Sequence, residues 1–344
     1  MKEFQLSIFV VFFIGLFISL VLNKLSLNFK GYFKQDNRED EIRLSNVKIP
    51  TFGGISMSLA FLISIRLLGK VDSEIIQIAI YAVFITLIGF LDDRYNLNWK
   101  LKLFLQFFAV STPIYLLNIY LNIEMLIGVN FSNNLNILIT IIWIILLVNS
   151  LNFLDNMDGL AATTATMIAI SLAILSYITN QYKLTDISVV LIASMLGFLI
   201  YNLPDARLYM GDSGSLFIGY CLGFISVLFS WNNSIESSWI FQIQPVILFF
   251  TIPLIDLTTV IISRIKQGKS PMTGGTDHIS HRLLKKGYSN IQVLIIFIFM
   301  SIIVLVVTMG ILYLNQTLSF LFLILYAFLV FAALFYFLRL EILN

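Results

Sequence analysis

Seven aspartates of this chain stand at polar interruptions between long apolar runs. They are Asp92, Asp93, Asp155, Asp158, Asp205, Asp212 and Asp277. If every apolar run crosses a membrane once, all of these interruptions open on the same side. Charge that served only solubility would fall on both sides, whereas groups that meet one polar substrate would not. The pattern therefore indicates a membrane-embedded enzyme with a single polar site.

Two of these carboxylates, Asp92 and Asp93, are adjacent and end the third apolar run. Adjacent carboxylates repel each other, so one of them tends to keep its proton unless a cation or a hydrogen-bond donor intervenes. Such a pair suits a general base or the reception of a metal-bound phosphate. An isolated pair would ordinarily be a polar helix end, but aspartate at a helix C-terminus opposes the helix dipole.

A second candidate segment, residues 149–160, has the sequence NSLNFLDNMDGL. Its polar residues recur every three or four positions, so on a helical turn they form one stripe between two apolar helices. They are Asn149, Asn152, Asp155, Asn156 and Asp158. Oxygen ligands of this kind suit Mg²⁺ or Mn²⁺ better than zinc.

A third candidate segment, residues 202–215, opens the eighth apolar run with NLPDARLYMGDSGS. Its Gly-Asp-Ser-Gly precedes a predicted helix, so backbone N–H groups can bind a phosphate while Asp212 binds the metal of that phosphate. Tyr209 can stack on a nucleobase. Asp212 or Ser213 alone would be an ordinary N-cap, and the functional interpretation rests on the other motifs of the same face.

The last candidate segment holds the only two histidines, His278 and His281, in a basic loop. Together with Asp277 they give no familiar four-ligand zinc spacing. Arg282 and the lysines that follow it favour phosphate binding instead.

Two further residues lie inside apolar runs. Asp256, two turns before Arg264, is either a site residue or the buried partner of that arginine. The single cysteine, Cys221, has no partner for an internal disulfide and is interpreted as a small packing residue.

The composition indicates that membrane helices position all of these residues. Of the 344 residues, 59% are hydrophobic and 12% charged, against about 45–50% and about 25% in ordinary soluble domains. A transmembrane helix needs about 20 mostly apolar residues. We therefore expect one all-α polytopic membrane domain, residues 1–344, with about eleven transmembrane helices. The candidate runs are 4–24, 52–68, 73–91, 102–121, 136–152, 159–179, 186–203, 213–231, 239–263, 291–313 and 317–338.

Lysine and arginine orient this predicted bundle. With eleven spans, the loops after odd-numbered spans and the C-terminus share one face, which carries seventeen basic residues against four on the other face. Cytoplasmic loops are enriched in lysine and arginine. We therefore expect the N-terminus outside, the C-terminus and the candidate site in the cytoplasm, and the protein in the cell membrane. The stretch 118–135 has no basic residue and is interpreted as an external excursion.

Two other classes of membrane protein fit parts of the pattern. An ion-coupled transporter also uses carboxylates, but carriers tend to place them near the bilayer midplane and to show repeated halves. No repeat of whole helices is found here. A lipid-carrier-binding protein without catalysis would not need the metal-binding and phosphate-binding residues together. The enzyme interpretation is therefore preferred.

Five motifs occur in the order and spacing of one known group of enzymes. They are KIPTFGG (48–54), LDDR (91–94), NSLNFLDNMDGL (149–160), YMGDSGS (209–215) and DHISHRL (277–283). On these motifs the chain resembles the polyprenyl-phosphate N-acetylhexosamine-1-phosphate transferases, whose relatives include phospho-MurNAc-pentapeptide transferase. The resemblance implies ten or eleven transmembrane helices, a cytoplasmic active site and, often, a homodimer.

The resemblance also implies a reaction. In the presence of Mg²⁺, or of Mn²⁺ in its place, a UDP-sugar and a membrane polyprenyl phosphate would react with each other. The products would be the polyprenyl-pyrophosphoryl sugar and UMP, and no nucleic acid takes part. By resemblance, Asp92 and Asp93 lie where the prenyl phosphate is received, one of them as the base. Asp212 matches the principal metal ligand and Asn152 a second one.

The other matching residues are expected to contact the two substrates. By resemblance, Lys48 and Lys102 are basic residues of the pocket, Asp155 and Asp158 lie near the nucleotide, and Asp158, Asn202 and Tyr209 belong to the uridine region. His278, His281 and Arg282 match the loop that meets the pyrophosphate and the sugar. We count Asp155 and this loop with the catalytic residues, and Asn149 with the substrate-binding ones.

Two differences from the motifs of related branches indicate which branch of the family the chain resembles. The peptidoglycan branch has three consecutive histidines where this chain has His-x-x-His-Arg, and the eukaryotic branch lacks the aspartates that stand at 155 and 158. Both favour the bacterial or archaeal N-acetylhexosamine branch, exemplified by transfer of GlcNAc 1-phosphate to undecaprenyl phosphate at the start of a cell-surface glycan.

The charge distribution predicts the topology, which cysteine labelling can test. Substitutions in the loops of the basic face should react only from the cytoplasmic side, and those in the other loops only from outside. The first set is Asp36→Cys, Leu97→Cys, Ala206→Cys and Gly274→Cys; the second is Val71→Cys, Phe131→Cys, Lys183→Cys and Asn315→Cys. Labelling of two motif-bearing loops from opposite sides would contradict a shared site.

Overall fold

Helices form all of the regular structure in the part of the chain that the computed structural model describes, namely residues 2–29, 49–68, 72–121, 132–232, 247–271 and 274–342. The predicted all-α class is therefore confirmed. Lys48 and much of the stretch 118–135 lie outside the described residues. The elements are α1 (Lys2–Ser26), the 3₁₀ helix η1 (Leu27–Phe29), α2 (Gly53–Leu67), α3 (Ser73–Tyr95), α4 (Trp99–Leu117), α6 (Asn133–Leu154), α7 (Leu160–Ile178), α8 (Tyr182–Asn202), α9 (Gly211–Asn232), α11 (Thr251–Lys266), α12 (Ile279–Lys285), α13 (Asn290–Tyr313) and α14 (Gln316–Ile342).

Ten of the eleven predicted spans coincide with helices in the described part of the chain. Within the described ranges, nine helices are long and apolar enough to cross a membrane, and α2 is a shorter apolar helix of 15 residues. The predicted span 239–263 is described only from residue 247, and that part contains α11. The chain is therefore a multi-pass α-helical membrane protein.

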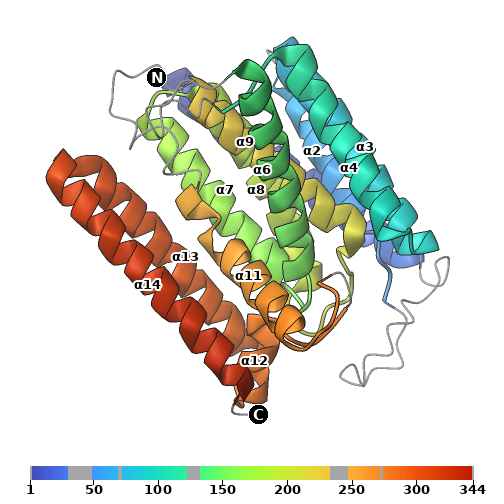
Figure 1. Cartoon of the computed structure of the whole chain (residues 1–344). Coiled ribbons are helices and arrows are strands. Elements are labelled where there is room, and N and C mark those ends of the chain that lie inside the picture. Colours follow the sequence, from blue (N-terminus) through green and yellow to red (C-terminus); the bar gives the residue numbers. More distant parts are fainter. Residues whose placement is uncertain are drawn as a thin grey trace.

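Helix α9 is the centre of the bundle because its small residues let other helices approach. Gly211, Ser215, Gly219 and Gly223 recur every four residues along it, a spacing that favours close packing of membrane helices. A methyl group on Gly219 would lie 2.6 Å from the Cα atom of Val148 in α6. In the most apolar part of α9, 94% of the residues are consequently buried, compared with 11% in α14. Helix α14 forms a pair with α13 beside the bundle (Figure 1).

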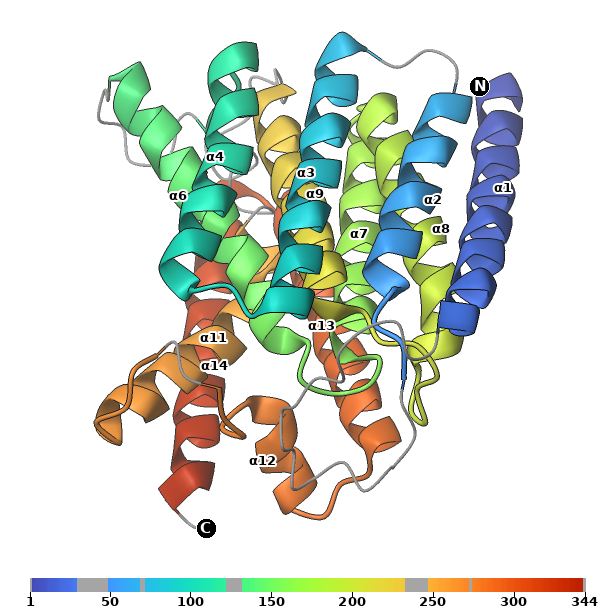
Figure 2. The ribbon, with the colours of Figure 1, turned by 90° about the vertical axis from the view of Figure 1, so that its right-hand side faces the viewer.

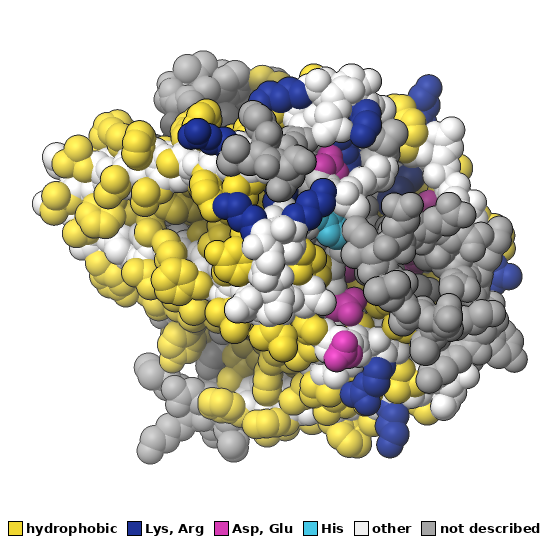
Figure 3. Space-filling model, turned by 90° about the horizontal axis from the view of Figure 1, so that it is seen from below, with side chains coloured by type: hydrophobic (Ala, Val, Ile, Leu, Met, Phe, Trp, Pro, Cys, Tyr) yellow, Lys and Arg dark blue, Asp and Glu magenta, His cyan; other side chains and the backbone are white. Residues whose placement is uncertain are grey.

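The two ends of the bundle differ in the segments they collect. The N-terminus of the chain lies at one end and the C-terminus at the other (Figure 2). The end with the C-terminus also holds the last turns of α3 and α6, the first turns of α4 and α9, and α12. Seen from this end, basic, acidic and histidine side chains gather over the bundle, and hydrophobic side chains lie to the left of and below them in the view (Figure 3). The candidate motifs therefore share one face.

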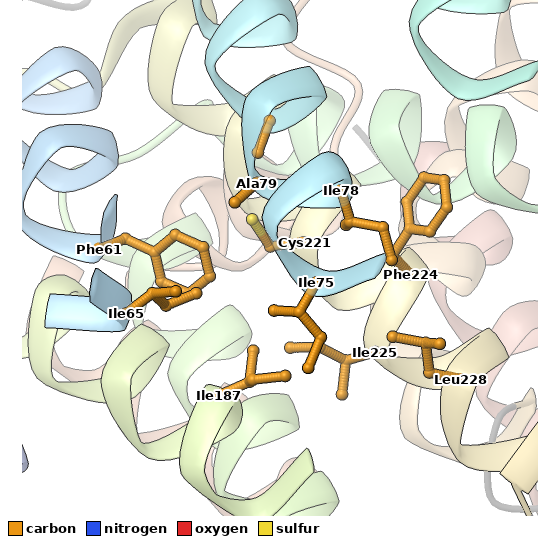
Figure 4. A pocket seen from close by; sticks show the side chains of 11 residues that line it. Phe61, Ile65, Ile75, Ile78, Ala79, Ile187, Cys221, Phe224, Ile225 and Leu228 are labelled. Atoms are coloured by element: carbon orange, nitrogen blue, oxygen red, sulfur yellow. The ribbon is translucent and has the colours of Figure 1, made fainter. Parts of the chain in front are cut away.

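A small apolar pocket lies between α2, α3, α8 and α9, toward the end opposite the motifs. Phe61, Ile78, Ile187 and Phe224 are among the side chains that line it, and the thiol of Cys221 points into it (Figure 4). Cys221 is buried and forms no disulfide. The pocket therefore belongs to the packing of the bundle, and the predicted packing role of Cys221 agrees with its position.

The close contact between α3 and α9 predicts an effect on stability. A methyl group on Gly89 would lie 2.4 Å from the carbonyl carbon of Asp212, so Gly89→Ala must push the two backbones apart. We expect a loss of about 1–3 kcal/mol, measured as a lower unfolding temperature in detergent. Gly310→Ala in α13 is the matched control, because no atom lies within 4 Å of the added methyl group. Equal unfolding temperatures for the two variants would contradict this account.

Candidate active site

Asp212, in the first turn of α9, is the centre of the candidate site. Its carboxylate forms an ion pair with the Lys102 ammonium of α4. It also accepts a hydrogen bond from Nδ2 of Asn152, at the end of α6, over 2.9 Å. Three helices far apart in the sequence therefore meet at one carboxylate, whose side chain is only 15% exposed.

Lys102 joins Asp212 to the aspartate pair of α3. Its Nζ atom lies 2.7 Å from Oδ2 of Asp92, so one ammonium stands between two carboxylates. The other oxygen of Asp92 accepts the backbone N–H of Leu97 over 2.8 Å. The result is a half-buried cluster of two carboxylates and one cation. A phosphate can compete for the ammonium of such a cluster, and a metal ion can compete for its carboxylates.

Asp93 has a different role from its neighbour, because it caps α9. Its two oxygens accept the backbone N–H groups of Asp212 over 2.7 Å and of Ser213 over 3.1 Å. Gly211 has a positive φ of 66°, and a methyl group there would lie 2.5 Å from Oδ2 of Asp93. This corrects the expectation that the start of α9 offers these N–H groups to a phosphate, since a carboxylate of α3 already binds them.

A second polar layer lies one helical turn from Lys102 and Asn152. Asn149 donates to Oε1 of Gln106 over 2.8 Å, and Gln106 is fully buried. Asn152 also donates to the hydroxyl of Ser215 over 2.8 Å. Gln106 lies outside the sequence motifs, and Ser215 ends one of them without a predicted role; the available signal was their spacing, four residues after Lys102 and three after Asp212.

The predicted nucleotide-binding residues shape two neighbouring loops. Asn202 is 3% exposed, accepts the N–H of Gly159 over 3.0 Å and donates to the carbonyl of Leu208 over 2.9 Å. Asp158 accepts the N–H of Ala206 over 3.2 Å. Asn202 thus braces the loops from inside rather than presenting its amide to a ligand.

Other predicted residues of this region keep some access to solvent. Asp155 and Tyr209 are both half-buried, and the backbone N–H of Tyr209 donates to the carbonyl of Pro50 over 2.9 Å. The segment before α9 is thereby attached to the segment before α2.

The loop before α12 is fixed to α11 by carboxylates. Asp277 accepts two hydrogen bonds from the Arg264 guanidinium, over 2.8 and 2.9 Å. Burial alone would raise the pKa of Asp277, but these hydrogen bonds and the charge of Arg264 outweigh it and lower that pKa. Asp256 contacts Nδ1 of His278 over 2.9 Å. The alternative in which Asp256 pairs with Arg264 is therefore wrong, because each has another partner.

Arg282 connects three segments of the chain by hydrogen bonds. Its guanidinium donates to the carbonyl of Asp277, to the hydroxyl of Ser263 and to the carbonyl of Phe337 in α14, over 2.8, 2.6 and 2.8 Å. Only 3% of the residue is exposed. All three nitrogens thus bind protein groups, and this differs from the predicted contact of Arg282 with the pyrophosphate.

The two parts of the site are joined by a side-chain hydrogen bond. The hydroxyl of Ser280, in α12, donates to Oδ1 of Asn156 over 2.5 Å, and the ring of His278 lies 6.1 Å from that of Phe153. The histidine loop therefore rests on the turn that follows Asn152. Asp92, Asp93, Lys102, Asn149, Asn152 and Asp212 form one cluster, and His278 and His281 lie beside it with ring centroids 5.9 Å apart.

Known proteins are similar in sequence to this chain. The sequence profile of glycosyl transferase family 4 matches residues 75–230. An undecaprenyl-phosphate alpha-N-acetylglucosaminyl 1-phosphate transferase of Haemophilus influenzae is 30% identical over 86% of this chain and 84% of its own length. A probable undecaprenyl-phosphate N-acetylglucosaminyl 1-phosphate transferase of Bacillus subtilis is 26% identical over 87% and 83%. A phospho-N-acetylmuramoyl-pentapeptide-transferase of Wolbachia pipientis is 28% identical over 76% and 83%.

The different partners of the adjacent aspartates predict different effects on stability. Asp93→Ala removes the cap of a buried helix and should cost about 0.5–2 kcal/mol, seen as a lower unfolding temperature in detergent. Asp92→Asn keeps the acceptor for Leu97 and leaves Lys102 paired with Asp212, so the unfolding temperature should change little. A larger destabilisation by Asp92→Asn than by Asp93→Ala would contradict the assignment of the cap.

Proposed function

The chain belongs to glycosyl transferase family 4, and on that premise we propose that it transfers an N-acetylhexosamine 1-phosphate, such as GlcNAc 1-phosphate, from a UDP-sugar to a membrane polyprenyl phosphate, such as undecaprenyl phosphate. An oxygen of the acceptor phosphate attacks the phosphorus that carries the sugar. The bond to the uridine-bearing phosphate breaks and UMP leaves. The product is a polyprenyl-pyrophosphoryl sugar, the first membrane-bound intermediate of a cell-surface glycan.

The observation that carries this proposal is the cluster of Asp92, Lys102 and Asp212 at the helix ends. Phosphoryl transfer depends on alignment of the phosphates and neutralisation of their charge more than on covalent chemistry. Lys102 is positioned to bind a phosphate oxygen once another cation takes its place beside Asp212. Of the adjacent aspartates, Asp92 is the one that meets the acceptor phosphate, because both oxygens of Asp93 are bound to α9.

Mg²⁺ is the ion that we propose for this site, with Asp212 and Asn152 as protein ligands and Mn²⁺ as a substitute. Among the described residues, no three His, Cys, Asp or Glu side chains form a metal site by themselves. Mg²⁺, however, is usually bound by one or two carboxylates together with substrate phosphates. The carboxylates of Asp92 and Asp212 already enclose one cation, so the donor set fits. When bound, the ion neutralises charge on the diphosphate.

The surface of α4 supports a lipid acceptor. Leu101, Phe104 and Phe108 are exposed on the helix that carries Lys102. The hydrocarbon tail of a polyprenyl phosphate can therefore stay in the bilayer while its phosphate reaches the ammonium. Because basic residues are in excess on this face, we propose that it lies on the cytoplasmic side of the cell membrane, where UDP-sugars are available.

The nucleotide is assigned to the loops around Asp155, Asp158 and Tyr209, which border the cluster. Lys48 and a homodimer remain predictions of the family resemblance. The transporter alternative has no support, because the relatives are named as transferases and the carboxylates stand at helix ends instead of mid-membrane.

Release of UMP tests the proposal directly. Purified protein with polyprenyl phosphate, Mg²⁺ and a panel of UDP-sugars should release UMP with at least one UDP-N-acetylhexosamine, and excess chelator should stop the reaction. Asp212→Asn should lower kcat by about 100-fold or more without unfolding the protein. Asp72→Asn is the control, since that exposed aspartate pairs with Lys183 away from the cluster. Full turnover in excess chelator would refute the metal assignment.

A further inference from the structure

Asp256 is a fully buried carboxylate that the proposed reaction leaves without a role. Its side chain is 0% exposed. Oδ1 accepts the backbone N–H of Ile279 over 2.8 Å, and Oδ2 lies 2.9 Å from Nδ1 of His278. A buried carboxylate is costly unless it is paired and hydrogen-bonded, and each oxygen of Asp256 has such a partner.

The contact at Oδ2 bears on which nitrogen of His278 carries its proton. An ionised carboxylate offers only acceptors, so opposite such a carboxylate Nδ1 is the donor. A histidine whose Nδ1–H is held by a carboxylate acts through Nε2. Nε2 lies on the edge of the ring opposite Nδ1 and therefore faces away from Asp256.

The neighbouring contacts fix the loop that carries the His278 ring. Arg264 binds Asp277 on one side of His278, and Ser280 binds Asn156 on the other. Asp256 and Arg264 are eight residues apart in α11, so the helix binds the loop at two points along its length, at His278 and at Asp277. Phe153, whose ring lies 6.1 Å from the imidazole, follows the Asn152 that binds Asp212.

We propose that Asp256 is a positioning residue, which holds His278 in the Nδ1–H form and presents Nε2 to the diphosphate and sugar of the donor. This inference rests on the proposed function. When Nε2 takes up a proton, Asp256 balances the charge of the ring and Nε2–H can donate to a phosphate oxygen. Among the described residues, the hydrogen bonds of the Asp256 carboxylate go to His278 and Ile279, so it acts through the histidine.

The form of the histidine can be measured without any activity. The chain has two histidines, so His281→Gln leaves one imidazole, and ¹⁵N-histidine NMR of that variant reports His278 alone. We expect Nδ1 to be protonated. Adding Asp256→Asn should remove the proton from Nδ1, because the single amide oxygen stays with Ile279 and the amide NH₂ then faces the ring. A ring protonated only at Nε2 when Asp256 is intact would overturn the proposal.

Kinetics separate this role from a purely structural one. Asp256→Asn should lower kcat for UMP release by about 10- to 100-fold and leave KM for polyprenyl phosphate unchanged. In a His278→Ala background the same substitution should cause no further loss, because residues that act as a unit are not additive. Thr259→Val is the matched control: this buried hydroxyl, one turn along α11, donates only within its own helix.

The outcomes distinguish the two proposals. Additive losses of kcat in the double variant, or an equal loss in Thr259→Val, would overturn the positioning role while the transferase assignment stands. If the intact protein releases no UMP with any UDP-sugar, the proposed function fails, and the NMR measurement still decides which nitrogen of His278 is protonated.

Discussion

The start of α9 imposes the constraint on which the rest of the site depends. A helix begins with backbone N–H groups that have no partner within the helix, and here that end lies inside the protein together with a carboxylate. Asp93 binds the N–H groups of Asp212 and Ser213, and Lys102 with Asn152 stabilises the charge of Asp212. The same contacts attach α3, α4 and α6 to the central helix. Packing of the bundle and assembly of the polar cluster are therefore one event.

The sequence was sufficient to predict the helices and the shared face of the motifs. Long apolar runs have few ways to satisfy their backbone groups in lipid, so their number and order determine which loops lie together. The eleven predicted spans and the all-α class follow from this constraint alone. The shared face of Asp92, Lys102, Asn152 and Asp212 follows from it as well, since each residue stands where an apolar run meets the same boundary, whereas the inclusion of Lys102 and Asn152 in one site was implied by the family resemblance.

Partner choice among side chains was not predictable in the same way. Asp92 and Asp93 are equivalent in the sequence, but successive residues of an α-helix point about 100° apart, so one faces α4 and the other faces α9. Helix geometry could have excluded one alternative. Asp256 and Arg264 are eight residues apart in a continuous helix, about 12 Å along its axis, which is too far for a direct ion pair. The role of Arg282 depends on where α14 packs, and no local pattern carries that information.

The bond from Arg282 to the carbonyl of Phe337 has a consequence for biosynthesis. Every member of the carboxylate cluster lies in or before α9, so these residues can meet while the later helices are still being made. The segment that carries the histidines is bound to α14 through Arg282, and α14 follows all other site elements in the chain. Until α14 has entered the bilayer, the loop therefore lacks the partner that the carbonyl of Phe337 supplies. The carboxylate cluster can thus form before the histidine loop has all of its contacts.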